Sequence, residues 1–246
     1  MNSWIRIPYP NPQARLRLFC FPYAGGGALG FLTWPRYLPS ETEVCAIQLP
    51  GREERIRETP ISRLSLVMEP LTEMMETYTD KPFAFFGHSL GSMISFELAR
   101  ELRRRNAAEP LHLFVSGRRA PHIPNPDPPI HQLPDADFIE KLRKYNGTPE
   151  AVLQHAELME LLLPVLKADF GIHETYVYAS EAPLDCPISA FGGSEDAEAP
   201  QDKLAAWEAQ TNGQFSLRMF PGGHFFLQEY RDDFLHELSR YLQRLI

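Results

Sequence analysis

The most constraining feature of this chain is segment 83–91, which reads Phe-Ala-Phe-Phe-Gly-His-Ser-Leu-Gly. Its four leading apolar residues predict a buried strand, and a helical pattern from Ser92 to Arg105 follows it. In this strand-to-helix context, Gly-x-Ser-x-Gly is typical of a nucleophile elbow, a sharp turn that holds a serine in a strained conformation. Gly87 and Gly91 lack the Cβ atoms that would crowd such a turn. The segment therefore predicts that Ser89 is a hydrolytic nucleophile.

Short apolar runs alternate with helical patterns, which predicts an α/β fold with a mostly parallel sheet flanked by helices. We expect a single domain over 1–246. The alternation stops after Ser116, where a proline-rich stretch and two helical patterns precede the next strand signal near Cys186. Insertions of this length are usually functional, so we expect a helical lid at about 120–185. The expected strands are 16–21, 44–47, 83–86, 111–115, 188–191 and 215–220, and the expected helices are 64–78, 92–105, 135–145, 151–173, 203–210 and 232–245.

A serine hydroxyl becomes a good nucleophile only when a base removes its proton and a carboxylate orients that base. His224 follows a strand pattern and two glycines, so it is the candidate base. Asp196 follows the strand pattern at 188–191 and is the preferred acid, in the chain order Ser, Asp, His. A short loop beyond that strand would let its carboxylate turn back toward the histidine. Three other carboxylates compete for this position, namely Asp185, Glu195 and Glu198.

An oxyanion hole requires backbone N–H groups that point at the developing negative charge. Leu90 follows the serine and should supply one, and the glycine-rich loop 21–27 should supply the other. His88 is adjacent to the serine, but neighbouring side chains on such a turn diverge, so we expect it to pack or to form hydrogen bonds.

The segment from Gly25 to Gly30 also matches the dinucleotide fingerprint Gly-x-Gly-x-x-Gly. That fingerprint requires glycines directly after the first strand and a carboxylate at the end of the second. Here Pro22 and Tyr23 intervene, and the second strand ends in Gln-Leu-Pro. We therefore expect no nucleotide cofactor, and because no metal-ligand spacing is present, we expect no metal.

The composition excludes several function classes. The net charge of −8 disfavours nonspecific nucleic-acid binding, which needs a basic surface. The run Arg103–Arg105 ends a predicted helix, where basic side chains interact favourably with the helix dipole and solvent. No apolar run approaches the length of a membrane span, and the N-terminus lacks a secretory pattern. The cysteines are odd in number and lie beside strand-like segments, so we expect reduced core thiols and a cytoplasmic protein.

Six segments, in order along nearly the whole chain, together resemble the type II thioesterases, stand-alone editing enzymes of nonribosomal peptide and polyketide synthesis. The matching segments are 21–26 (Phe-Pro-Tyr-Ala-Gly-Gly), 48–55 (Gln-Leu-Pro-Gly-Arg-Glu-Glu-Arg), 86–91, 163–170 with 174–176, 192–196 and 221–226. The resemblance implies an α/β-hydrolase fold with a helical lid and hydrolysis of acyl groups from the phosphopantetheine arm of carrier proteins. It assigns Ser89 as nucleophile, Asp196 as acid and His224 as base, with oxyanion donors at the N–H groups of Ala24 and Leu90.

This resemblance also implies the partners: phosphopantetheinylated acyl or peptidyl carrier proteins of a nonribosomal peptide or polyketide synthase, served in trans by a monomer. Carrier proteins are generally acidic, so Arg118 and Arg119 are candidate docking residues. A carboxylesterase or lipase, an acyltransferase and a non-catalytic binding protein remain as alternatives. Apolar lid residues could line an acyl channel or simply pack the lid, and the candidates are Phe138, Leu142, Leu158, Leu162 and Phe170.

Overall fold

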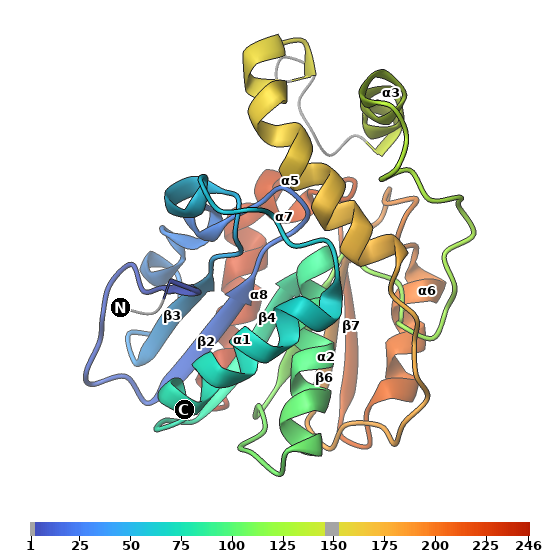
Figure 1. Ribbon diagram of the computed structural model, residues 1–246. Coiled ribbons are helices and arrows are strands. Elements are labelled where there is room, and N and C mark those ends of the chain that lie inside the picture. Colours follow the sequence, from blue (N-terminus) through green and yellow to red (C-terminus); the bar gives the residue numbers. More distant parts are fainter. Residues whose placement is uncertain (1–2, 146–152) are drawn as a thin grey trace.

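A single mixed sheet of seven strands, in the order β1-β3-β2-β4-β5-β6-β7, forms the centre of the molecule (Figure 1). The computed structural model describes residues 3–145 and 153–246. β1 runs antiparallel to β3, and the other neighbouring pairs are parallel. The strands are β1 (Ile5–Arg6), β2 (Leu16–Phe21), β3 (Thr42–Ile47), β4 (Phe83–His88), β5 (Leu113–Ser116), β6 (Ile188–Gly193) and β7 (Phe215–Phe220).

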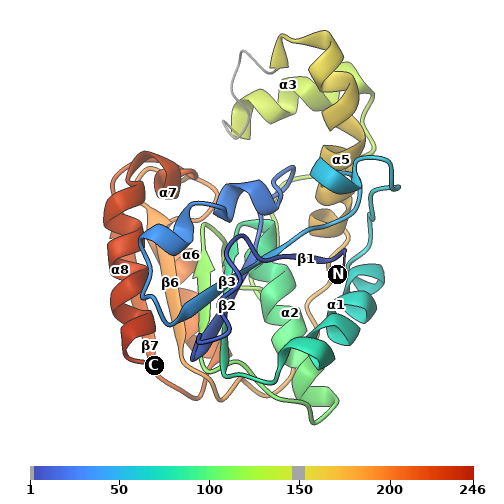
Figure 2. The same ribbon diagram turned by 90° about the vertical axis from the view of Figure 1, so that its left-hand side faces the viewer.

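Helices cover both faces of this sheet (Figure 2). Successive side chains of a strand point to opposite faces. In β4, Phe85 packs into the apolar cluster that includes α1 and α2, whereas Phe86 packs into the cluster that includes α8. The helices are α1 (Leu64–Tyr78), α2 (Leu90–Arg104), α3 (Asp135–Tyr145), α5 (Ala156–Glu174), α6 (Gln201–Ala205), α7 (Phe226–Glu229) and α8 (Arg231–Gln243), with 3₁₀ turns η1 (Ala28–Phe31), η2 (Trp34–Arg36), η3 (Glu53–Arg55) and η4 (Ala206–Gln210).

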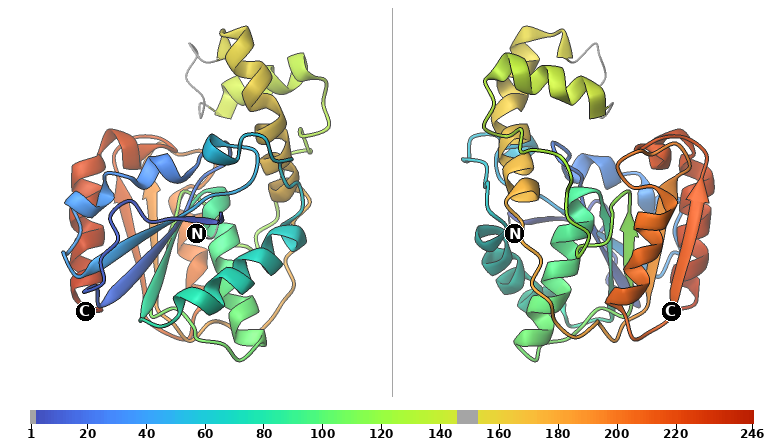
Figure 3. Two further views of the ribbon diagram at one scale, coloured as in Figure 1. Left: turned by 60° about the vertical axis from the view of Figure 1, so that its left-hand side comes forward. Right: turned by 90° about the vertical axis from the view of Figure 1, so that its right-hand side faces the viewer.

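The segment between β5 and β6 forms a separate layer. α3 and the first half of α5 stand above the sheet, and the second half of α5 descends onto it (Figures 2 and 3). The raised part has an apolar cluster of its own, formed by Ile130, Phe138, Leu142, Leu153, Met159 and Leu166. This layer lies within the range expected for a lid.

The mostly parallel, helix-covered sheet confirms the α/β prediction, and the differences from the sequence-based elements are local. The short strand β1 was not anticipated, because two residues carry no periodicity. The helix expected over 203–210 divides into α6 and η4. The helix expected over 151–173 begins at Ala156, and residues 151 and 152 lie outside the described residues.

The cysteines match the expectation of core thiols. Cys20, Cys45 and Cys186 are buried and form no disulfide. Burial raises the pKa of the Cys186 thiol to about 12, so it is protonated at neutral pH. In the described part of the chain, every helix is too short or too polar to cross a membrane.

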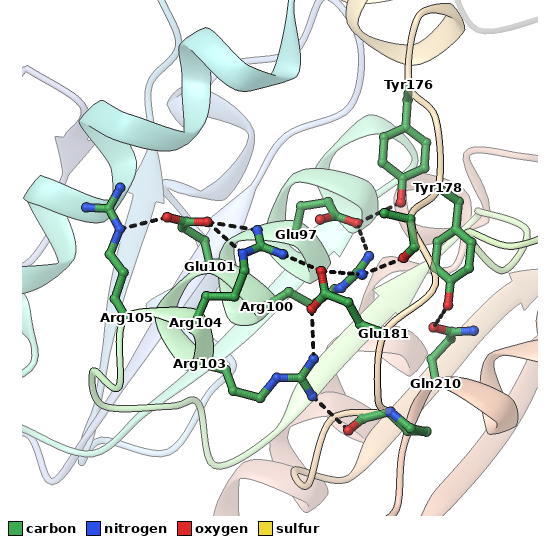
Figure 4. A network of polar contacts seen from close by, with 12 residues as sticks. Glu97, Arg100, Glu101, Arg103, Arg104, Arg105, Tyr176, Tyr178, Glu181 and Gln210 are labelled. Atoms are coloured by element: carbon green, nitrogen blue, oxygen red, sulfur yellow. Dashed lines mark hydrogen bonds and ion pairs between the residues drawn. The ribbon is translucent and has the colours of Figure 1, made fainter.

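The arginine run at the end of α2 is paired with carboxylates as well as solvated (Figure 4). Arg104 Nη1 lies 2.6 Å from Glu181 Oε1, and Arg105 Nε lies 2.7 Å from Glu101 Oε1. Arg103 reaches the same Glu181 at 3.1 Å. The run therefore ties the end of α2 to the segment that follows α5.

A buried histidine on the sheet predicts that acid destabilises the fold. Burial lowers the pKa of His112 to about 4, whereas an unfolded histidine titrates near 6.5. Below about pH 6.5 the unfolded chain binds the proton first, so the free energy of unfolding falls as the pH falls toward 4. We expect His112→Phe to reduce this slope by about 1.2 kcal/mol per pH unit, measured by urea unfolding between pH 5 and 6. His236→Gln, at an exposed histidine, is the control, and equal slopes in the two variants would contradict the prediction.

Candidate active site

Ser89 occupies the turn between β4 and α2 in a strained backbone conformation. Its φ of 54° and ψ of −112° lie outside the regions that non-glycine residues normally occupy. A Cβ on Gly91 would lie 2.1 Å from the carbonyl oxygen of Phe21, and one on Gly87 would lie 2.3 Å from the Gly91 backbone. The two glycines therefore permit the close approach of strand, turn and helix that holds Ser89 at the carboxyl end of β4.

His224 and Asp196 meet beyond the ends of β7 and β6. His224 Nδ1 lies 2.8 Å from Asp196 Oδ2, and the Asp196 side chain is 1% exposed. The other carboxylate oxygen, Oδ1, accepts N–H groups from Glu198 at 2.9 Å and Ala199 at 3.3 Å. Because an ionised carboxylate only accepts hydrogen bonds, the contact places the imidazole proton on Nδ1 and leaves Nε2 as the basic nitrogen.

The competing carboxylates are exposed or have other partners, although Glu198 also lines the pocket that contains Ser89. Asp185 is exposed and accepts a hydrogen bond from Asn212 at 3.0 Å, and Glu195 is also exposed. Glu198 lies 3.3 Å from Arg119. Of the four acids considered from the sequence, Asp196 is the one hydrogen-bonded to His224.

One pocket brings the nucleophile candidate, the base candidate and the backbone donors together. Ser89, His224, Ala24 and Leu90 line it. Within the described residues, no hydrogen bond uses the amide N–H of Ala24 or Leu90. Both donors are therefore available to a bound oxyanion.

Some of the apolar side chains considered from the sequence reach this pocket. Leu142 of α3 and Phe170 of α5 line the pocket. Phe138 is fully buried in the cluster of the raised layer, whereas Leu158 is 36% exposed. Leu162 packs against the same cluster. Leu142 and Phe170 thus reach the pocket, whereas Phe138 and Leu162 pack within the segment between β5 and β6.

His88 is 1% exposed and is not among the residues that line this pocket. Its Nδ1 lies 2.9 Å from Ser116 Oγ, and its ring centre lies 5.0 Å from that of His224. Burial lowers the pKa of His88 well below its usual value, so the ring is neutral. These contacts agree with the packing and hydrogen-bonding role expected from the sequence.

Comparison with known proteins identifies the family. The family model for the thioesterase domain matches residues 16–242. The chain belongs to the thioesterase family. As a member of this family, it is a hydrolase.

Three individual proteins give the scale of this similarity. The gramicidin S biosynthesis protein GrsT of Aneurinibacillus migulanus is 48% identical over 100% of this chain and 96% of its own. The protein named linear gramicidin dehydrogenase LgrE, from Brevibacillus parabrevis, is 42% identical over 98% of this chain and 93% of its own. The solved structure of the type II thioesterase BorB from the borrelidin biosynthetic cluster superposes with a TM-score of 0.88, at 35% identity and 98% coverage of each chain. The resemblance to type II thioesterases and the α/β-hydrolase fold are confirmed.

The glycine-rich loop of this thioesterase differs from the dinucleotide fingerprint in two respects, although one relative is named a dehydrogenase. The N–H of Gly25 donates to the Asp169 carboxylate at 2.6 Å, so an anionic side chain already occupies the donor that a phosphate would use. The loop continues into the short 3₁₀ turn η1, where the fingerprint requires the start of an α-helix. Among the described residues, no cluster of three or more His, Cys, Asp or Glu side chains could hold a metal ion.

The position of Arg118 shows that one expectation about the surface of this thioesterase is wrong. It was expected to be a docking residue, but it is only 9% exposed, donates to His173 Nδ1 at 3.0 Å and lines the active-site pocket. Burial lowers its pKa to about 10. Arg119 also lines the pocket and is paired with Glu198. The sequence could not distinguish these positions from surface ones because their burial depends on residues far along the chain, His173 for Arg118 and Glu198 for Arg119.

The sequence assigned no role to Arg52 or Asp169, which form a buried ion pair beside the pocket loop. Both lie in segments that carried the family resemblance, 48–55 and 163–170. Their presence in those two segments was the available signal.

Proposed function

We propose that this thioesterase hydrolyses acyl thioesters on the phosphopantetheine arm of acyl or peptidyl carrier proteins, acting in trans to clear misprimed or stalled carriers. The observation that carries the proposal is the 2.8 Å contact between His224 and Asp196, at a pocket that Ser89 also lines. The names of GrsT and BorB, which refer to gramicidin S biosynthesis and to the borrelidin cluster, support this class of partner.

In the proposed reaction, His224 Nε2 removes the Ser89 proton while the serine oxygen attacks the thioester carbonyl carbon. The carbonyl oxygen becomes an oxyanion that the N–H groups of Ala24 and Leu90 stabilise. Asp196 holds the imidazole tautomer and stabilises the imidazolium. The carbon–sulfur bond then breaks, and His224 returns the proton to the departing pantetheine thiolate.

Water completes the cycle. His224 removes a proton from a water molecule, which attacks the acyl-serine carbonyl. Collapse of the second tetrahedral intermediate releases the free acid and reprotonates Ser89. We propose that α3 and α5 act as the lid, with Leu142 and Phe170 contacting the acyl chain.

Mass spectrometry of intact carrier proteins tests the substrate class. We expect the enzyme to convert acyl-loaded carriers to free phosphopantetheine carriers, with a higher kcat/KM than for a simple oxygen ester of the same acyl group. The reason is that part of the binding energy comes from the pantetheine arm and the carrier. A higher kcat/KM on the simple ester would support a carboxylesterase or lipase instead. Acyl transfer to an added alcohol or amine in preference to water would support an acyltransferase.

A further inference from the structure

A fully buried carboxylate joins α5 to the glycine-rich loop of the pocket. The Asp169 side chain is 0% exposed. Its Oδ2 accepts the backbone N–H of Gly25 at 2.6 Å and Arg52 Nη1 at 2.7 Å, and its Oδ1 accepts Arg52 Nη2 at 2.8 Å. The carboxylate thus has a two-pronged contact with the guanidinium and a third hydrogen bond to the loop.

Arg52 completes the attachment from the other side. Its Nη1 also donates to the carbonyl oxygen of Gly26 at 3.1 Å, and its Nε donates to that of Pro50 at 3.3 Å. Asp169 and Arg52 therefore bind one N–H and one carbonyl of the same tight turn. The planar guanidinium makes these contacts in a fixed geometry.

α5 also packs directly on this turn. Gly25 has a φ of +79°, and a Cβ built there would lie 2.7 Å from Leu166 Cδ2 of α5. The second half of α5 and the loop thus fit together with no room for a side chain at Gly25. The half that bears Asp169 is fixed to the body of the protein.

Ala24, the proposed oxyanion donor, immediately precedes Gly25 and lines the pocket with Ser89. A buried ion pair adds little to the free energy of unfolding, because the cost of desolvation offsets most of the attraction. It can, however, hold the groups around it in one arrangement. We propose that Asp169 and Arg52 are positioning residues that hold loop 23–27 with the Ala24 N–H aimed into the pocket. The second half of α5 then supports the oxyanion hole through this loop, an inference that rests on the proposed function.

A second buried pair provides a matched control (Figure 4). Glu97 Oε1 lies 2.7 Å from Arg100 Nη1 and accepts the Tyr176 hydroxyl at 2.7 Å. This pair also links the core to the chain that leaves α5, but neither Glu97 nor Arg100 lines the pocket. Glu97→Gln therefore removes a buried carboxylate without touching the loop.

The experiment compares Asp169→Asn, Arg52→Lys and Glu97→Gln with the wild type on an acyl-carrier thioester. We expect Asp169→Asn to lower kcat by roughly 10- to 100-fold, approaching the loss of one oxyanion donor, while KM changes less than about twofold. Arg52→Lys should cause a smaller loss, because Asp169 still accepts the Gly25 N–H. Glu97→Gln should lower Tm but leave kcat within about twofold.

The affinity for an acyl-pantetheine trifluoromethyl ketone is a second measurement. A residue that only stabilises the fold would not change this affinity. The Ser89 oxygen adds to the ketone carbon, its proton passes to His224, and the resulting oxyanion occupies the hole. We expect Asp169→Asn to weaken this inhibitor by about the same factor as kcat, and Glu97→Gln to leave it unchanged.

Two results would overturn the inference. One is an Asp169→Asn enzyme whose kcat and inhibitor affinity match those of Glu97→Gln, and the other is a rise in KM alone. If Asp169→Asn does not fold, wild-type kcat and inhibitor affinity in Arg52→Lys overturn it as well. Failure of the proposed function is distinguishable, because it appears as a Ser89→Ala enzyme with wild-type activity, and that result removes both proposals.

Discussion

Replacing Ser89 by alanine is expected to lower kcat/KM on an acyl-carrier thioester by roughly 10⁴ to 10⁶. The reason is that the reaction loses its covalent intermediate, while His224 and the backbone donors remain in place. What is left is the assistance that a positioned base and the oxyanion donors give to direct attack by water. Single-turnover release of the acyl group, followed by mass spectrometry of the carrier, measures the residual rate.

Ser95→Ala is the matched control. Ser95 is a fully buried serine of α2 that donates to the carbonyl oxygen of Ser92 at 3.1 Å, and it does not line the pocket. We expect its activity to stay within about threefold of the wild type, since it removes one hydroxyl of ordinary structural value. Similar rates in the two variants would remove Ser89 from the mechanism.

Local patterns explain why the candidate residues of this site could be chosen from the sequence. A nucleophile elbow is specified within nine residues, because the strand, the two close-packing glycines and the helix are adjacent in sequence. The turn geometry at Ser89 and the packing of Gly87 and Gly91 follow from that segment. Asp196 and His224 could be chosen as candidates because each follows a strand of a parallel sheet, and the carboxyl ends of such strands lie along one edge.

Contacts between distant segments explain what was not predictable. The pairing of Arg52 with Asp169 joins residues 117 positions apart, and no periodicity connects them. The burial of Arg118 likewise depends on α5, whose His173 covers it. A sequence pattern reports the face of an element that is apolar, but it does not report which other element will cover a charged residue.

Replacing Asp196 by asparagine is the second change with a large expected effect, roughly 10² to 10⁴ in kcat. The side chains have nearly the same shape, so the fold should be retained. The amide group, however, can donate to His224 Nδ1 and so favour the tautomer with its proton on Nε2, the nitrogen that must accept the Ser89 proton. It also lacks the charge that stabilises the imidazolium.

Glu195→Gln distinguishes this role from a general effect of removing negative charge near the site. Glu195 is the neighbour of Asp196 on the same loop and was a competing candidate, but it is exposed. We expect its kcat to stay within about twofold of the wild type, because an exposed carboxylate interacts weakly through water. If Glu195→Gln matched the loss in Asp196→Asn, the 2.8 Å contact would not identify the acid of the triad. The expected result is that only Asp196→Asn loses activity, and that the loss is in kcat with little change in KM. This result would show that the contact between Asp196 and His224 stabilises the transition state.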